Sequence, residues 1–414
     1  MLNFININSH IVYFDKDNHL ARYLSLYFCS SLSPDFMNVD FLNENDWFLT
    51  LVAAIAIISL FVQLGYYLVV FRKLAFYTPA EMSSENKPVS IIISARNEFE
   101  NLNKNIYSVL EQEYPEYQVV IINDCSWDDT KEFLEDLEKK YSHLKVVTII
   151  DRDKYRRGKK FALTLGIKAA EYECLLFTDA DCKPASKYWL QRMQSGFTEK
   201  KEIVLGYGAY EKESGLLNKL IRFETFYVAV QYLSFALHKM PYMGVGRNLA
   251  YKKELFFANK GFARHNHLLS GDDDLFINDV ATKNNVSIQL HPESFTCSEP
   301  KKNFSTWGVQ KVRHVSTGKY YKKNHRNALI YNHLTHFTFY LSLIVLLVLG
   351  FDWRIILGIY FFRLAIQLFI FGRNMKKLNE FDLFPFIPLF DIFLLIFYPV
   401  VGINSKFSKN ILWK

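Results

Sequence analysis

The sequence has few cysteines and lacks the glycine-rich motifs of two common nucleotide-binding folds. Its five cysteines are an odd number without a Cys-x-x-Cys pair, which excludes a disulfide framework and a zinc module. Neither G-x-x-x-x-G-K-[S/T] nor G-x-G-x-x-G occurs, so a P-loop NTPase and a Rossmann dehydrogenase are not supported. Glycine accounts for only 17 of the 414 residues, which excludes a collagen-like chain. We therefore expect reduced, mostly buried cysteine thiols. Only for Cys29 does the sequence leave this interpretation undecided.

Apolar residues, by contrast, are abundant and unevenly distributed. Hydrophobic residues make up 50% of the chain and charged residues 22%, and the formal net charge is +7. Such a chain can bury a core, which excludes global disorder. A basic balance is typical of proteins that meet nucleic acid, anionic lipid headgroups or phosphorylated substrates. Because the hydrophobic residues gather in long runs, we expect a lipid bilayer as partner and no nucleic acid.

The long apolar runs flank a more polar middle segment. Residues 48–71 have the length that spans a bilayer and are apolar on all sides, which is rare for a helix in a globular core. Residues 334–351 and 355–371 are separated by three residues and predict a transmembrane helical hairpin. The last segment is interrupted by three prolines and Asp391, and it is either transmembrane or re-entrant. The predicted organisation is an N-terminal tail (1–47), a transmembrane helix (48–71), a soluble domain (86–332), two transmembrane helices (334–351 and 355–371) and the last segment (384–404).

Basic clusters at the ends of these runs predict the orientation. All of them face the cytoplasm if the first run crosses from outside to inside, as the bias of Lys and Arg toward cytoplasmic loops requires. We therefore expect an integral protein of the cytoplasmic membrane whose soluble domain faces the cytoplasm. A fourth full span would export the basic C-terminal tail, which favours a re-entrant last segment. The clusters are Arg72 and Lys73, then Lys322, Lys323 and Arg326, and finally Arg373, Lys376 and Lys377.

Two further segments leave alternatives open. Arg363 lies within the third run, where a guanidinium either faces protein or water or reaches to the membrane interface. Residues 216–238 form a long apolar segment that is either an interfacial helix bringing an acceptor to the site or an ordinary core helix.

The middle segment alternates short strands with helices. Residues 89–94 and 119–123 are rich in β-branched side chains and predict buried strands, and residues 145–150 and 174–178 predict two more. Helical periodicity falls between them, over 101–112, around 133–141 and over 159–170. Successive strand–helix units predict an α/β domain with a doubly wound, mostly parallel sheet. Such sheets bind ligands beyond the carboxyl ends of their strands.

Acidic residues follow three of the four predicted strands. Asp128 and Asp129 are best explained as helix caps. Asp179 and Asp181 flank a small alanine directly after a buried strand, so both carboxylates are expected to point the same way. Two carboxylates held so close repel each other unless a cation lies between them, and hard oxygen ligands suit Mg²⁺ or Mn²⁺. This pair therefore predicts a metal site that also takes phosphate oxygens.

Three more charged clusters have both a functional and a structural interpretation. The basic residues 152–160 around Gly158 either clamp a diphosphate or form a solvated loop. Residues 272–274 are three adjacent aspartates, which form either an exposed turn or a general base whose pKa its neighbours raise. A helix over the sequence QKVRH would bind an anionic leaving group or lie on the membrane surface, with one face shared by Gln310, Arg313 and His314.

Taken in order, these motifs resemble those of the membrane-bound inverting glycosyltransferases of family 2, which have a GT-A fold. The resemblance covers about residues 88 to 320 and is to the group that includes cellulose, hyaluronan and chitin synthases. Each motif alone is weak, whereas seven in the right order are specific. They are VSIIISARNE, VVIINDCSWDDT, RGKKFALTLG, FTDADC, GVGRNLAYKKE, SGDDD and QKVRH.

The resemblance implies a role for individual residues. Metal coordination falls to Asp181, with Asp179 beside it on the nucleotide side, and the general base is either Asp272 or Asp273. Asp273 fits the G-D-D order, whereas Asp272 fits the position of the following leucine. The implied donor-binding residues are Ala95, Glu98 and Asp124 at the base and ribose, Lys159 at the pyrophosphate, and Gln310 and Arg313 at the diphosphate. The acceptor-side residues would be Gly246, Asp274 and His314.

Two departures from the family pattern modify this expectation. Asn123 replaces a common Asp, and His314 replaces the Trp with which processive synthases contact the acceptor sugar. With only three or four membrane segments, a non-processive enzyme is expected. It would be a metal-dependent hexosyltransferase that moves a sugar from a nucleotide-diphosphate sugar, expected to be a UDP-sugar, to a membrane-proximal, lipid-linked or polysaccharide acceptor of the cell envelope. The alternative is a non-catalytic partner with this fold in a polysaccharide assembly or export complex.

Overall fold

The computed structural model describes residues 47–79, 82, 85–150, 158–268 and 270–407. Its central sheet has seven strands in the order β3-β2-β1-β4-β8-β6-β9. The four strands predicted from the sequence are β1 to β4, each within two residues of its expected ends. The bounds are β1 (Val89–Ala95), β2 (Tyr117–Asp124), β3 (Leu144–Ile149), β4 (Cys174–Phe177), β6 (Ile203–Leu205), β8 (Leu249–Lys252) and β9 (Val286–Ile288).

Most neighbouring strands run parallel, as the alternation of strands and helices predicted. Strands β3, β2, β1 and β4 pair in parallel, and so do β6 and β9. Strand β8 is antiparallel to both β4 and β6. A second sheet of three short strands holds β5 (Cys182–Pro184), β10 (Thr296–Ser298) and β7 (Gly208–Tyr210). The fold class is therefore mixed α/β with a mostly parallel sheet.

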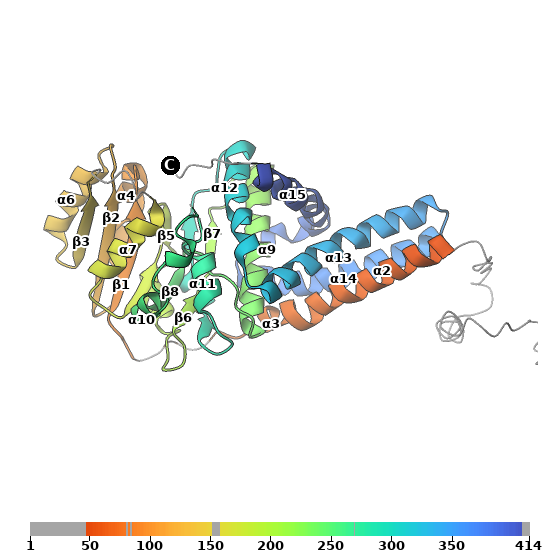
Figure 1. Ribbon diagram of the computed structural model, residues 1–414, viewed down its shortest axis with the longest axis horizontal. Helices are drawn as coiled ribbons and strands as arrows, with labels where there is room; N and C mark the ends of the chain where they lie inside the picture. The colour runs from red at the N-terminus through yellow and green to blue at the C-terminus, as the bar shows by residue number, and fades with distance from the viewer. Residues whose placement is uncertain (1–46, 80–81, 83–84, 151–157, 269, 408–414) are drawn as a thin grey trace, which may run out of the picture. The chain divides into compact units, whose positions relative to one another are not determined.

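Helices cover both faces of the large sheet (Figure 1), and its central strands β1 and β4 are buried throughout. In β1, Ile91 and Ile93 pack toward one cluster of buried residues and Ile92 toward the other. The expected helix over 101–112 is two short helices separated only by Ile106, whose backbone stays helical. The helices are α4 (Phe99–Asn105), α5 (Tyr107–Leu110), α6 (Thr130–Lys140), α7 (Lys159–Ala169), α8 (Trp189–Gln194), α9 (Leu216–Leu237), α10 (Lys253–Ala258), α11 (Asp274–Val280) and α12 (Phe304–Thr317).

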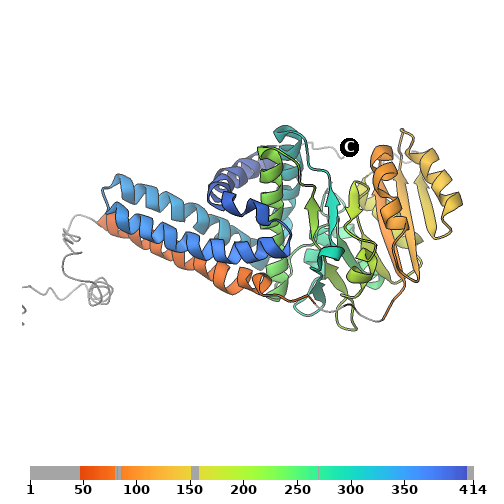
Figure 2. The same cartoon turned by 180° about the vertical axis from the view of Figure 1, so that it is seen from behind.

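Within the described residues, four further stretches of helix are long and apolar enough to cross a membrane, judged by length and composition. Helices α13 and α14 form the predicted hairpin, and α2 lies beside them in both views (Figures 1 and 2). Helix α15 packs against α12, where the Trp307 and Phe397 rings stack at 4.6 Å. The bounds are α2 (Trp47–Gly65), a π-helix (Tyr66–Phe71), α3 (Arg72–Ala75), α13 (Lys323–Val348), α14 (Trp353–Lys377), a 3-10 helix (Phe381–Phe386) and α15 (Ile387–Phe407).

The last apolar segment consists of the end of the 3-10 helix followed by α15. It continues through Pro399 without reversing, so the described residues show no re-entrant hairpin. Whether it crosses the membrane stays a prediction. The basic ends of α3 and α14 adjoin each other. There Arg373 Nε donates to the carbonyl of Ala75 at 3.4 Å, and Lys73 Nζ donates to the carbonyl of Leu237 at 3.5 Å.

Arg363 on α14 faces protein and does not reach toward an interface. Its side chain is fully buried and forms an ion pair of 2.9 Å with Asp391 on α15. The same guanidinium donates to Gln63 Oε1 at 2.9 Å and to the Tyr67 hydroxyl at 3.0 Å. His336 on α13 lies 3.1 Å from the Asp391 carboxylate. This buried network therefore joins all four apolar stretches through one charge pair.

Candidate active site

The carboxyl ends of β1 and β2 bring the predicted nucleotide-binding residues together. Ala95 ends β1 and pairs in register with Asn123, the residue before Asp124. Both Ala95 and Asp124 are buried, and Glu98 follows in the loop between β1 and α4. Asn97, which sequence reasoning did not single out, adopts a φ of 53° and accepts a hydrogen bond from the Trp127 amide at 3.0 Å. The two loops after these strands are thus fastened to each other.

Of the two residues expected to cap α6, Asp128 forms the contacts. Its carboxylate accepts from the backbone amide of Thr130 at 3.2 Å and from that of Phe99, at the start of α4, at 3.2 Å. Asp129 occupies the N-cap position of α6, and its side chain accepts no capping hydrogen bond. Asp128 therefore holds the starts of two helices together, which also fixes the loop after β2.

The paired aspartates after β4 lie close together. Ligand atoms of Asp179, Asp181 and Cys182 all fall within 4.8 Å of one another. Burial, together with the charge of Asp179, raises the pKa of Asp181. Burial acts on Asp179 in the same direction, but Lys159 holds the pKa of that carboxyl below its usual range. The two aspartates therefore differ, because the pKa of Asp179 is lowered by the adjacent Lys159 and that of Asp181 stays raised.

Lys159 connects this pair to the acidic cluster before α11. Its ammonium lies 2.6 Å from Asp179 Oδ1 and 3.4 Å from Asp272 Oδ2. Gly158 precedes it with a φ of 129°, a conformation that side chains disfavour and that turns the chain into α7. The lysine is therefore held at the start of a helix between two groups that lie almost a hundred positions apart in the sequence.

The three aspartates at the start of α11 have different surroundings. Asp272 faces Lys159. The carboxylate of Asp273 accepts from the backbone amides of Gly246 and Asp274, both at 2.7 Å. Asp274 accepts from the hydroxyls of Thr317 and Tyr321, which tie it to the end of α12. Burial, and then the charges of Asp272 and Asp274, raise the pKa of Asp273 to about 7. Of the three aspartates, Asp273 thus has the surroundings of a proton acceptor near neutral pH.

Lys160 holds the loop that leads into these aspartates, and sequence reasoning placed it only in a general basic cluster. Its ammonium donates to the carbonyl oxygens of His265, Leu268 and Ser270 at 2.7, 3.0 and 2.6 Å. Burial lowers the pKa of this lysine, and its three backbone acceptors compensate the buried charge. Lys160 is a positioning residue because it fixes the backbone before Asp272.

Replacing Lys160 by methionine should loosen this loop. Three backbone acceptors would lose their donor, and hydrogen bonds to charged groups contribute about 1.5–3 kcal/mol each. We expect faster amide hydrogen exchange from His265 to Asp274, with little change in β1 or β2. Lys168→Met, on the exposed face of the same helix, is the matched control. Equal exchange in both variants would show that Lys160 does not hold the loop.

The expected face of α12 points into the same site. Gln310, Arg313 and His314 all line one pocket with Asp179 and Asp273. Among the described residues, Gln310 Oε1 and Arg313 Nε are buried atoms without a hydrogen-bond partner.

Arg247 was missed from the sequence, although its segment GVGRNLAYKKE was singled out. Its guanidinium lies 4.3 Å from the centre of the Tyr210 ring and donates to the Ala209 carbonyl at 3.0 Å. It also donates to Ser298 Oγ at 2.9 Å. The charge of this half-buried cation acts to lower the pKa of Asp181, against the effect of burial. The positive charge of Arg247 therefore favours the ionised form of the paired aspartates, Asp179 and Asp181.

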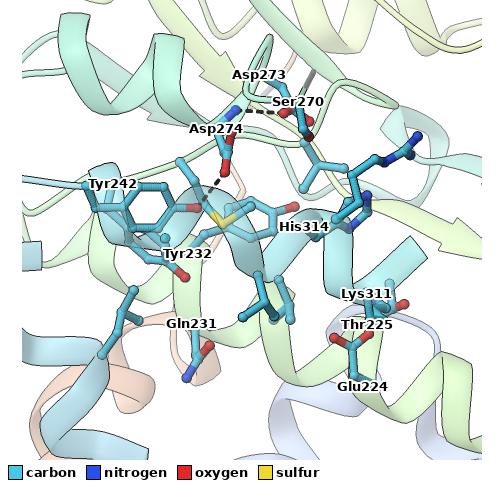
Figure 3. A pocket seen from close by; sticks show the side chains of 18 of the residues that line it. Glu224, Thr225, Gln231, Tyr232, Tyr242, Ser270, Asp273, Asp274, Lys311 and His314 are labelled. Carbon is cyan, nitrogen blue, oxygen red and sulfur yellow. Dashed lines mark hydrogen bonds and ion pairs between the residues drawn. The ribbon is translucent and has the colours of Figure 1, made fainter. Parts of the chain in front are cut away.

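The pocket has a volume of about 850 Å³ and extends well beyond the acidic residues. Asp273 and Asp274 lie at one side of it, and Glu224, Thr225 and Gln231 from α9 lie across from them (Figure 3). Helix α9 is mostly buried, which agrees with a core helix, and one face of it lines the pocket. The basic residues 152–157 and the tail 1–46 lie outside the described residues, so their expected roles stay predictions.

Residues 90–263 match the family model described as glycosyl transferase family 2. A curated relative is the poly-beta-1,6-N-acetyl-D-glucosamine synthase of Staphylococcus epidermidis, 40% identical over 93 residues, which are 22% of this chain and 21% of that protein. Another is glycosyltransferase AglE of Haloferax volcanii, 33% identical over 113 residues, or 27% of this chain and 36% of that protein. The chain therefore aligns with only about a fifth to a third of the length of these relatives.

Among solved structures, the chain resembles the mannosyltransferase PcManGT of Pyrobaculum calidifontis, determined in complex with GDP-Man and Mn²⁺. The TM-score is 0.52 at 18% identity, over 79% of this chain and 99% of that one. At this identity the likeness bears on the fold alone. The α/β domain is therefore similar over residues 90–263 to glycosyl transferase family 2, has a GT-A-like fold and is joined to long apolar helices.

Proposed function

We propose that the protein is an inverting, metal-dependent glycosyltransferase that moves a sugar from a nucleotide-diphosphate sugar to an acceptor hydroxyl. The observation that carries the proposal is the convergence of Asp179, Asp273 and Arg313 on one pocket, together with Asp181 beside Asp179. A proton acceptor, a metal-binding carboxylate pair and a cation for a leaving diphosphate are the groups that this reaction needs. The acceptor would be membrane-proximal and lipid-linked or a polysaccharide.

The residues after β4 fit a divalent cation. Asp181 is a half-buried carboxylate with a raised pKa, and it accepts a hydrogen bond from the weak donor Sγ of Cys182 at 3.5 Å. A hard cation on Asp181, with Asp179 beside it, would relieve the repulsion between the two carboxylates. Bound there, Mg²⁺ or Mn²⁺ would supply positive charge to the diphosphate oxygens of the donor.

The protein groups act on either side of the sugar that is transferred. Asp273, held in one orientation by two backbone amides, takes the proton from the acceptor hydroxyl as its oxygen attacks the anomeric carbon. The bond from that carbon to the diphosphate oxygen breaks in the same displacement, which inverts the configuration. Arg313 and Gln310 line the pocket, where Arg313 Nε and Gln310 Oε1 have no hydrogen-bond partner among the described residues, and they would bind the departing diphosphate.

The long apolar helices support a membrane location, and the basic helix ends support a cytoplasmic position of the catalytic domain. His314 in place of the processive synthases' Trp supports single transfers over polymer extrusion.

The direct test is release of nucleoside diphosphate by the detergent-purified full chain across a panel of nucleotide-sugars, including UDP-N-acetylglucosamine and GDP-mannose. With Mn²⁺ or Mg²⁺ present, we expect release from one donor. Asp181→Ala should lower it at least about 100-fold, because the loss of residues that only support metal ligands already costs 10–100-fold. The assay would also identify the donor.

The matched control is Asp136→Ala, which removes an exposed carboxylate on α6 that pairs with Lys139. It should behave like wild type. Equal release by wild type and Asp181→Ala would contradict the metal role. Silence with every donor, together with no donor binding by calorimetry, would favour the non-catalytic partner of an export complex.

A further inference from the structure

The pocket continues from the acidic residues to the membrane helices. Beyond Asp273 it is lined by α9 and by the second half of α12, and then by α13 and α15. From Val52 onward the chain forms one compact unit, so these walls belong to the same body. A donor site alone does not require walls from two helices that are long enough to cross a membrane. The far part of the pocket therefore needs its own explanation.

The wall formed by α9 is polar where it faces the acids. Thr225 and Gln231 are more than nine-tenths buried, and within the described chain Thr225 Oγ1 and Gln231 Nε2 have no hydrogen-bond partner. Both side chains line the pocket opposite Asp274 (Figure 3). Buried polar atoms without a partner are costly, so such atoms on a pocket wall indicate a polar ligand. The hydroxyl groups of a sugar match a donor amide and a hydroxyl.

Glu224 on the same wall already interacts with other protein side chains. It forms an ion pair with Lys311 of α12, and its other oxygen accepts from the Tyr398 hydroxyl of α15 at 3.3 Å. These contacts fasten α9, α12 and α15 around the pocket. The contacts of Glu224 therefore hold this wall in place. Thr225 and Gln231 carry the atoms on it that can still hydrogen-bond to a ligand.

Farther out, the pocket lies between α13 and α15. The two helices touch where the His333 and Tyr398 rings lie 4.7 Å apart. The α13 residues that line the pocket lie on both sides of His333, and those of α15 continue from Tyr398 toward its C-terminus. We call this part the α13/α15 slot, lined by Ile330, Leu334, Phe337, Pro399 and Gly402.

The slot is apolar and open on its outer side. The exposed fractions of Ile330, Leu334 and Phe337 are 51%, 50% and 46%, although all three line the pocket. A Cβ atom added at Gly402 would meet nothing within 4 Å, so this side of the slot is empty space. Because α13 and α15 have the length and apolar character of membrane helices, the slot faces hydrocarbon if they cross a bilayer.

We infer that the pocket binds a lipid-anchored sugar acceptor that enters sideways from the bilayer. The apolar anchor would occupy the α13/α15 slot, and the sugar headgroup would meet Thr225 and Gln231 with a hydroxyl toward Asp273. This inference rests on the proposed function for the identity of the reacting group. Two kinds of anchor share the required chemistry, a diacylglycerol and a polyisoprenyl phosphate.

Photolabelling of the full chain in phosphatidylcholine vesicles tests the slot without any transfer reaction. Two probes with the same glucosyl headgroup would carry a diazirine in the apolar anchor, one on diacylglycerol and one on polyisoprenyl phosphate. We expect adducts of at least one probe on residues 330–337 and 399–405, reduced by an excess of the unlabelled lipid. The probe that labels would identify the anchor.

Two variants that fill the slot from opposite walls make the test specific. Gly402→Leu and Leu334→Trp should each reduce the adducts about tenfold, because a side chain in the slot excludes the anchor. Gly358→Leu on α14 is the matched control, since that glycine also has no atom within 4 Å of an added Cβ and does not line the pocket. Thermal unfolding of each variant checks the fold.

The inference is overturned if neither probe labels the slot. It is also overturned if adducts are as frequent on Phe361 and Phe362 of α14 as in the slot, or if the properly folded slot variants label like wild type. Because labelling needs neither donor nor turnover, a chain without transferase activity can still pass this test. An active transferase can still fail it, so the two failures are distinguishable.

Discussion

Asp273→Asn should lower kcat by about 10²–10⁴-fold, the usual contribution of a positioned general base. The amide keeps the size of the side chain but cannot take the proton of the acceptor hydroxyl. Donor binding should change little, because Lys159, Gln310 and Arg313 would remain in place. Steady-state transfer with the donor found in the release assay gives kcat, and calorimetry gives the donor Kd.

Asp272→Asn is the natural comparison, since the sequence alone left both residues open as the base. Asp272 lies 3.4 Å from Lys159, so its loss should act on the donor side with a smaller effect on kcat. If Asp272→Asn abolished turnover while Asp273→Asn retained it, the two roles would be exchanged. If donor affinity collapsed in both variants, neither residue would be the base.

The pH dependence of the wild type gives a second readout on Asp273. The base must be ionised to accept a proton, and burial with two neighbouring carboxylates raises its pKa to about 7. We therefore expect kcat/KM to rise about tenfold per pH unit below this value and to level off above it. The Asp273→Asn variant should lose this limb. An acid limb with a pKa near 4 in the wild type would show that another carboxylate controls the reaction.

Arg363→Leu should destabilise the helical part by about 3–5 kcal/mol, the cost of leaving a buried charge without its partner. The variant would leave Asp391 buried, and Gln63 and Tyr67 would lose their donor as well. The loss should therefore affect the packing of α2, α14 and α15 together. Denaturant unfolding in detergent micelles, followed by the fluorescence of the buried Trp307 beside α15, measures it.

The double variant Arg363→Met/Asp391→Leu separates charge from packing. Removing both charges should recover much of the stability, because apolar residues often replace a buried ion pair without loss. Arg354→Met, at the exposed start of α14, is the matched control and should unfold like wild type. A single Arg363→Leu variant within about 1 kcal/mol of wild type, the range of an exposed ion pair, would contradict a structural role for this pair.

The strands and most of the site could be predicted because their signals are local. Runs such as Val89–Ala95 are buried on both faces of the sheet, so their apolar character is continuous in the sequence. Once the strands are known, parallel order places their carboxyl ends at one edge, and Asp124, Asp179 and Asp181 follow directly. The helical face of Gln310, Arg313 and His314 needed only the helical repeat. These features depend on spacing within a few residues.

Contacts between distant segments could not be predicted in this way. Lys160 appeared as one of several basic residues, although it meets carbonyls more than a hundred positions away. The choice between Asp272 and Asp273 depends on Lys159 and on the Gly246 amide, which neighbouring sequence does not reveal. Arg247 was overlooked because a lone arginine in a strand-entry segment has no pattern of its own.

By itself the sequence determined the fold class, the apolar helices and the order of the acidic and basic motifs, because each depends on short-range periodicity or on direct succession along the chain. Only the tertiary structure decided which aspartate faces Lys159, which arginine is buried against Asp391, and that α9, α13 and α15 extend the pocket toward the membrane helices. The reason is physical: the energy of a buried charge or an unpartnered polar atom depends on the groups packed around it, and folding brings those groups from distant parts of the chain.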